Sequence, residues 1–169
     1  MKRKAAILLC ILLALGLSAC WNKGITRDQL KEVVLQNFNL APEDSATITY
    51  AGEFSDGEDV LVWFIIQKNA FTYYRAIDCR TVSEDRYEVK DILFPKIYAE
   101  DIASLLWKTE LLFLINSPEC RRIVVDDKKG NILYEIQLSE DDLPYLYQVV
   151  SFGQRSRTSF LDAQGKALF

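Results

Sequence analysis

The first periodic segment of this 169-residue chain has the spacing of a helix. Its apolar positions recur three to four residues apart, which places them on one helical face; they are Leu30, Val33, Val34 and Phe38. Thr26 followed by Gln29 has the spacing of a capping box, in which two side chains satisfy free N–H groups of the first turn. The pattern predicts a helix from Arg27 to Asn37.

The next fifty residues have the patterns of strands. Apolar and polar residues alternate from Thr47 to Phe54, and an acidic turn at Asp56 to Asp59 leads into an unbroken apolar run from Val60 to Ile66. Such a run is typical of a central strand covered on both faces. A second pair of strands, Phe71 to Arg80 and Tyr87 to Phe94, extends the predicted antiparallel sheet to four strands.

The remainder predicts one more helix and further strands. Ile102, Leu105 and Leu106 fit the inner face of a short helix over Glu100 to Lys108, and Leu111 to Ile115 either continues that helix or forms a buried strand, which we favour. Further extended segments are predicted at Cys120 to Val125, Ile132 to Leu138, Leu143 to Val150 and in a small hairpin over Phe160 to Gly165. We therefore expect a single compact α+β domain over residues 26–169, with a mainly antiparallel sheet and two or three helices.

The first nineteen residues have the pattern of an export signal. Lys2 to Lys4 are basic and precede a 13-residue apolar run, which suits a signal peptide and is short for a bilayer span. The block Leu17-Ser18-Ala19-Cys20 resembles the lipobox of bacterial lipoproteins. This resemblance implies cleavage before Cys20, lipidation of its thiol and anchoring by acyl chains. An ordinary secretory signal cut after Ala19 is the alternative.

If the lipobox is used, residues 1–19 are the signal peptide, 20–25 are a short lipidated tether, and the domain sits close to the membrane on its extracytoplasmic face. The part from Cys20 onward carries 17 basic and 24 acidic residues, a difference of −7. A surface of this charge repels polyanions, so we expect no nucleic-acid partner. The expected partners are the membrane, through the lipid, and an envelope protein or a wall component.

Histidine is absent from the chain. Ser-His-Asp and Cys-His catalysis and imidazole metal ligation therefore have no residue to use, and we expect no metal and no cofactor. The acidic clusters around Glu58, Asp101 and Glu140 fall in predicted turns or at helix starts, where solvation and capping account for them. A small envelope hydrolase that uses two carboxylates is the alternative to a non-enzymatic binding or accessory protein.

Cys79 and Cys120 are the only cysteines that follow Cys20. An exported protein with two such residues either joins them in one disulfide or buries them as separate thiols. The sequence spacing does not decide between these alternatives.

Aromatic and basic residues are interleaved near the C-terminus. Tyr145, Tyr147, Arg155 and Arg157 are candidates for a ligand surface for glycan or peptide, because rings supply contact area and guanidinium groups supply hydrogen bonds. The alternative, which we favour, is that these rings cover the last sheet as part of the core. Tyr73 and Tyr74 raise the same question, since neighbours on one strand face opposite ways.

Three short blocks resemble those of small lipoproteins of Gram-positive bacteria that have no assigned activity. They are Asn116-Ser-Pro-Glu-Cys120, Pro144-Tyr-Leu-Tyr147 and Phe160-Leu-Asp-Ala-Gln-Gly165. The resemblance covers the last third of the chain and assigns no role to any residue.

Overall fold

The computed structural model describes residues 24–38, 46–99, 101–127, 129–149 and 156–169. One α-helix, α2 (Arg27–Asn37), precedes eleven strands. The strands are β1 (Ala46–Asp56), β2 (Asp59–Lys68), β3 (Phe71–Ser83), β4 (Arg86–Leu93), β5 (Lys96–Ala99), β6 (Ile102–Trp107), β7 (Glu110–Ile115), β8 (Arg122–Asp127), β9 (Ile132–Gln137), β10 (Tyr145–Gln148) and β11 (Ser156–Leu161). A 3-10 turn, η1 (Glu140–Asp142), lies between β9 and β10.

Helix α2 has the predicted bounds and the predicted cap. The Gln29 N–H donates to Oγ1 of Thr26 at 3.3 Å, and the Thr26 N–H donates to Oε1 of Gln29 at 2.9 Å. Both bonds satisfy donors that a helix start leaves free. Leu30 and Val34, one turn apart, are buried against the first sheet.

The first sheet has the antiparallel order β1-β2-β3-β4. Its central strand β2 is buried at seven consecutive positions, Val60 to Ile66, and its two faces serve different cores. One face packs under α2, and the other packs Leu61 and Trp63 against Leu114 of the second sheet. The predicted hairpin, the four-strand sheet and the doubly covered central strand are confirmed.

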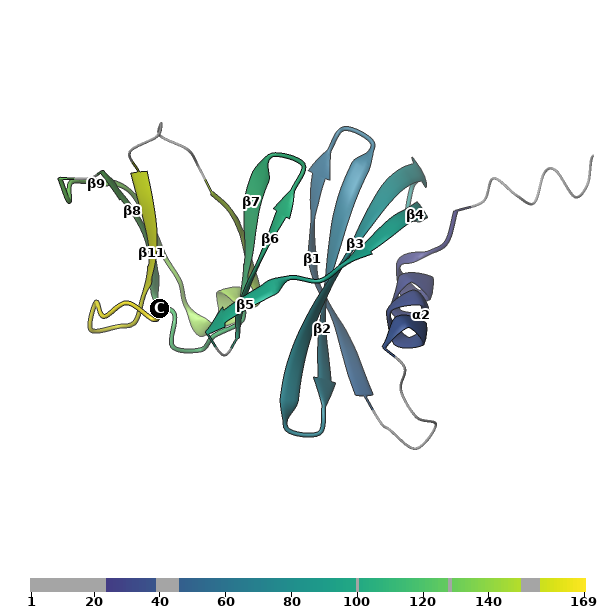
Figure 1. Ribbon diagram of the computed structural model, residues 1–169, viewed down its shortest axis with the longest axis horizontal. Coiled ribbons are helices and arrows are strands. Elements are labelled where there is room, and N and C mark those ends of the chain that lie inside the picture. Colours follow the sequence, from purple (N-terminus) through teal and green to yellow (C-terminus); the bar gives the residue numbers. More distant parts are fainter. Residues whose placement is uncertain (1–23, 39–45, 100, 128, 150–155) are drawn as a thin grey trace, which may run out of the picture.

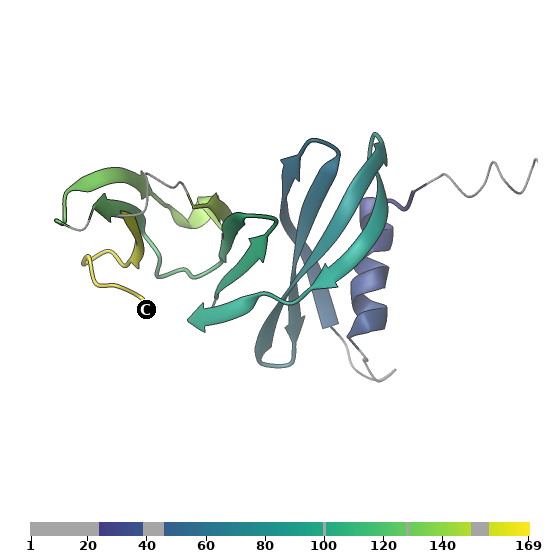
Figure 2. The same cartoon turned by 45° about the horizontal axis from the view of Figure 1, so that its top comes forward.

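Two smaller sheets complete the fold, with the orders β10-β7-β6-β5 and β11-β8-β9. Figures 1 and 2 show α2 at one end of the long axis, the first and second sheets next to it, and the third sheet at the other end. A separate core joins the second and third sheets and contains Phe113, Tyr147 and Phe160.

The predicted fold class is wrong in its helix content. The described residues contain one α-helix and a 3-10 turn, so the fold is mostly antiparallel β rather than α+β with two or three helices. The helix predicted for Glu100 to Lys108 is also wrong: Glu100 lies outside the described residues, and the segment from Ile102 onward is strand β6. Three apolar residues in so short a run fit either period.

The other C-terminal predictions hold where they can be compared. Leu111 to Ile115 lies in β7, the extended segments at 120–125 and 132–138 form the β8–β9 pair, and β10 lies within the predicted segment 143–150. A hairpin closes after β11 through a bridge between Leu161 and Ala167. That the domain over 26–169 is single stays a prediction.

Candidate binding surface

The predicted C-terminal ligand surface is largely core. Tyr147 is 4% exposed and Tyr145 is half-buried, and both pack in the cluster between the second and third sheets. Arg157 lies on β11, in another sheet, and its Nη2 donates to Asp126 at 3.0 Å. Arg155 lies outside the described residues. The structure therefore does not gather the side chains of Tyr145, Tyr147 and Arg157 on one open surface.

The two cysteines occupy different cores. Cys79 is buried beneath α2 and Cys120 is buried in the cluster of the third sheet, and both thiols are free. Burial raises the pKa of Cys79 to about 12 and raises that of Cys120 as well, because a thiolate loses its hydration there. Of the two alternatives, a disulfide or two separate buried thiols, the structure shows the second. Cys20 lies outside the described residues.

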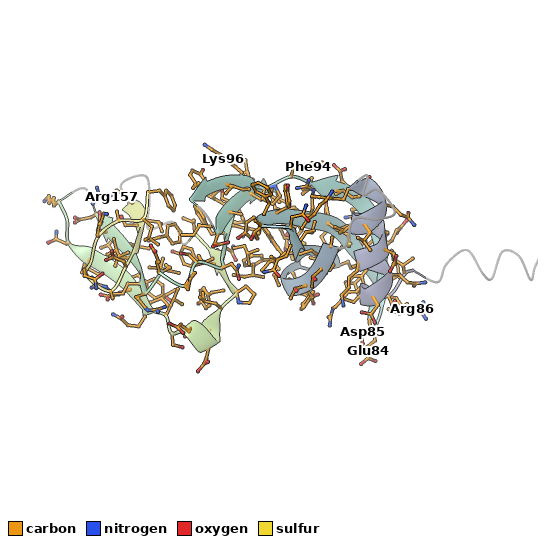
Figure 3. All side chains as sticks on the ribbon, turned by 90° about the horizontal axis from the view of Figure 1, so that it is seen from below. Glu84, Asp85, Arg86, Phe94, Lys96 and Arg157 are labelled. Carbon is orange, nitrogen blue, oxygen red and sulfur yellow. The ribbon has the colours of Figure 1, made fainter. Side chains whose placement is uncertain are left out.

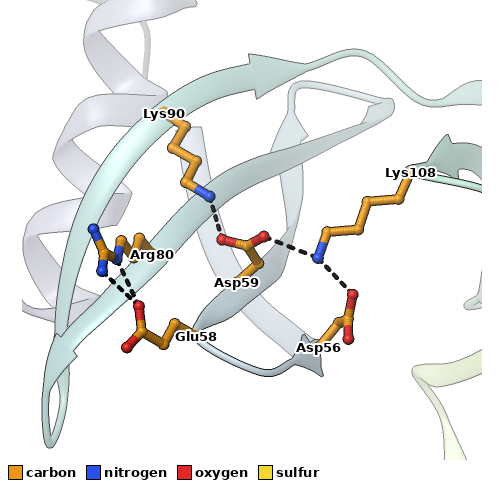
Figure 4. A network of polar contacts seen from close by, with 6 residues as sticks. All are labelled: Asp56, Glu58, Asp59, Arg80, Lys90 and Lys108. Atoms are coloured by element: carbon orange, nitrogen blue, oxygen red, sulfur yellow. Dashed lines mark hydrogen bonds and ion pairs between the residues drawn. The ribbon is translucent and has the colours of Figure 1, made fainter.

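The acidic turn between β1 and β2 belongs to an ion-pair network, drawn in Figure 4. Lys90 and Lys108 both donate to Asp59, and these bonds lower the pKa of its carboxyl group to about 2. Lys108, which follows β6, also reaches Asp56 at 2.5 Å. The turn carboxylates thus bind the first sheet to the second.

Two further carboxylates hold turns. Hydrogen bonds from Asn131 lower the pKa of Asp127, and bonds from Ser139 lower that of Asp142. Hydrogen bonds of this kind favour the charged form of a carboxyl group. Within the described part of the chain, no three His, Cys, Asp or Glu side chains are placed to hold a metal ion.

A different aromatic and basic cluster is open to solvent. We define the arginine–aromatic surface as Phe38, Phe71, Tyr73, Arg75 and Phe94. Strand alternation turns Tyr73 and Arg75 of β3 to the face that α2 covers, and Phe38 is the C-cap residue of α2. Phe94 follows the last residue of β4. Three segments that are distant in sequence therefore meet at this corner of the first sheet.

The Arg75 guanidinium lies between two rings. Its Cζ is 5.0 Å from the centroid of Phe38 and 4.5 Å from that of Phe94, distances at which a cation is attracted to a ring face. The Phe38 ring also meets Tyr73 edge-on, with centroids 4.9 Å apart. Phe71 and Phe94 are 65% and 66% exposed, so the cluster presents apolar area beside its charge.

Arg75 has no acidic partner among the described residues. Its Nη1 donates to the carbonyl oxygen of Tyr74 at 2.7 Å, and burial lowers its pKa. Arg27, by contrast, lies 3.6 Å from Glu53, and its pKa is raised, chiefly by a hydrogen bond to Tyr87. A guanidinium group carries five N–H donors, so Arg75 can still bind a carboxylate.

Sequence reasoning did not single out this surface. The sequence predicted that Tyr73 and Tyr74 face opposite ways, and in the structure they do. Tyr74 is 2% exposed in the core, whereas Tyr73 is half-buried on the face covered by α2. The available signal was the alternation of Tyr73 with Arg75 on one strand face. The contributions of Phe38 and Phe94 depend on tertiary contacts.

No helix in the described part of the chain is long and apolar enough to cross a bilayer. Neither a family model, nor a curated protein, nor a solved structure matches this sequence or fold.

Proposed function

We propose that the chain is a non-enzymatic, lipid-anchored binding or accessory protein on the extracytoplasmic face of the cell membrane. It docks an acidic segment of another envelope protein on the arginine–aromatic surface. The lipobox at Leu17 to Cys20 and the short stretch before Arg27 support a position close to the bilayer.

The choice of this surface rests on one observation. Arg75 is partly desolvated between two rings and has no carboxylate partner in the described residues. A half-buried charge is costly unless it is paired, and a partner's Asp or Glu supplies the missing charge. Exposed Phe71 and Phe94 add apolar area to the same contact. Rings and arginine are the residue types that dominate binding energy at protein interfaces.

A protein carboxylate suits this surface better than a nucleic acid does. A polyanion binds through several basic groups that release counterions together, whereas the chain from Cys20 onward carries a charge of −7. A single guanidinium group flanked by rings instead fits one acidic side chain with apolar neighbours.

The test is site-specific photo-crosslinking of the anchored protein in intact cells. A photoreactive phenylalanine replaces Phe94 in one strain and Ile132 in another. Ile132 is a matched control because it is 59% exposed and lies on β9, in the third sheet. Each version is also made with Arg75→Gln and with Arg75→Lys, and captured proteins are identified by mass spectrometry.

The proposal predicts that position 94 captures one envelope protein reproducibly and position 132 does not. Arg75→Gln is expected to reduce capture at least about tenfold, because a charged hydrogen bond is lost, and Arg75→Lys is expected to reduce it less. Equal capture from both positions contradicts the proposed surface, and so does capture from position 94 that Arg75→Gln leaves unchanged. Capture of wall glycan in place of a protein contradicts the proposed partner.

The alternative, a carboxylate-dependent hydrolase, needs an acid whose pKa is raised so that it can donate a proton. The described carboxyl groups with shifted pKa values are Asp59, Asp127 and Asp142, and all three are shifted downward. No observation in the described residues favours the hydrolase, so we do not propose it.

A further inference from the structure

A cavity of about 690 Å³ opens where α2, the segment before it and the β3–β4 hairpin meet. Its volume falls in the range of small-molecule sites. It is separate from the arginine–aromatic surface, because none of that surface's five residues lines it.

Three apolar side chains contribute to the lining of the cavity, beside polar ones. Ile25 comes from the segment before α2, Val33 from α2 and Val89 from β4. All three also pack against the core beneath the helix. These side chains therefore offer hydrocarbon contact to a ligand that enters the seam between helix and sheet.

The wall is preformed by a close backbone approach. Ile25 and Tyr87 exchange two backbone hydrogen bonds, of 2.8 and 2.9 Å. A Cβ on Gly24 would lie 2.7 Å from the Tyr87 carbonyl oxygen and 2.5 Å from Cγ2 of Val82, so only glycine fits there without displacement. Gly24 and Ile25 are thus held against the edge of β4.

The charged residues that line the mouth carry a net charge of −1. Glu58, Arg80 and Glu88 line it. Arg80 donates from Nε and Nη2 to Oε2 of Glu58, at 2.9 and 2.6 Å, so these two charges offset each other (Figure 4). Glu88 lies opposite Arg80 across the β3–β4 pair and interacts with its guanidinium group through charge, so two carboxylates share one cation.

From this arrangement we propose that the cavity binds an apolar ligand that ends in a cationic amine. The hydrocarbon part lies against Ile25, Val33 and Val89, and the ammonium group meets the Glu88 carboxylate at the mouth. An anionic ligand of the same shape is disfavoured, because it brings two like charges together.

The test uses the full-length anchored chain in nanodiscs of zwitterionic lipid, with valine methyl groups labelled for NMR. Three probes of matched size are titrated: pentylamine, pentanol and pentanoate. The readout is the shift of the Val33 and Val89 methyl signals. Glu88→Lys reverses the charge at the mouth, and Glu84→Lys is the matched control, since Glu84 is exposed in the neighbouring turn, does not line the cavity and points away from the body in Figure 3.

We expect pentylamine to shift both valine signals at lower concentration than pentanol, with pentanoate the weakest. Glu88→Lys is expected to weaken pentylamine binding about tenfold and to leave pentanol binding unchanged, and Glu84→Lys is expected to leave both unchanged. Arg80→Gln, which frees Glu58, is expected to tighten pentylamine binding about threefold, the size of one exposed charge pair.

Pentanoate binding as tightly as pentylamine overturns the proposal. So does pentylamine binding that both lysine variants weaken equally, which would indicate a general effect of net charge. Valine signals that none of the three probes moves also overturn it, and a thermal melt of each variant checks that the fold is intact in every case.

Discussion

Two strand arginines with aromatic neighbours have opposite surroundings in this molecule. Arg157, in the third sheet, has a carboxylate at 3.0 Å, and Tyr147 and Phe160, which are near it in sequence, are buried in the core. Arg75, in the first sheet, has no such carboxylate within the described chain, and Phe94, one of the two rings that its guanidinium group contacts, is about two-thirds exposed. Figure 3 shows Phe94 near the first sheet and Arg157 at the far end of the molecule.

The difference shows that sequence proximity of rings and arginine does not make a binding surface. Tyr145 and Tyr147 are close to Arg157 along the chain, yet they fill the core that joins two sheets. Phe38 and Phe94 are 37 and 19 positions from Arg75, and they contact its guanidinium group. The strand face and the availability of a counter-ion decide which arginine is open to a partner.

The largest expected effect separates core rings from surface rings. Tyr147→Ala should reduce the free energy of unfolding by about 3–5 kcal/mol, because it empties a packed site. Phe94→Ala should change it by less than about 1 kcal/mol, because the ring is mostly solvated. Chemical denaturation of both variants measures this. Similar losses for the two would place Phe94 in the core and break the comparison.

A smaller effect concerns the paired arginine. Arg157→Gln should cost about 1 kcal/mol of unfolding free energy, since it leaves the nearly buried Asp126 without its cation. In an Asp126→Asn background the same change should cost close to nothing. This double-mutant cycle isolates the pair. An unchanged cost in both backgrounds would mean that Arg157 is not held by Asp126.

The smallest effect is the pH dependence of a paired charge in the first sheet. The pKa of Asp59 is about 2, below its ordinary value, because Lys90 and Lys108 donate to it. A carboxyl group whose pKa is lower in the folded state than in the unfolded state stabilises the fold at pH values above its unfolded-state pKa. This contribution is lost as the pH falls from about 4 toward 2. The unfolding free energy of Asp59→Asn should therefore fall less over that range than that of the unmutated chain. Parallel curves for the two would mean that the lysines do not hold Asp59.

Local signals predicted the first half of the fold well. The capping box of Thr26 and Gln29 fixed the start of α2, and the apolar run after Asp59 marked β2 as central. The helix predicted for residues 100–108 was wrong because the turns there contain no glycine that would have marked them. Asp101 and Lys108 adopt φ values of 74° and 54°, which few non-glycine residues do. No turn signal in the sequence therefore argued against a helix, which the spacing of Ile102, Leu105 and Leu106 favoured.

The candidate surface was beyond prediction from sequence for a different reason. Strand alternation places Tyr73 and Arg75 on one face, and this much is readable from the chain. That Phe38 ends its helix above them, and that Phe94 leaves β4 beside them, follows from packing between distant segments. That no carboxylate of the described residues pairs with Arg75 is likewise a tertiary property.

The most direct measurement places the same photoreactive residue at position 94 and at position 157 of the protein in intact cells, with and without Arg75→Gln. The account predicts reproducible capture of one envelope protein from position 94, a loss of at least about tenfold on Arg75→Gln, and no matching capture from position 157. Stronger capture from position 157, or capture from position 94 that is unaffected by Arg75→Gln, would contradict it.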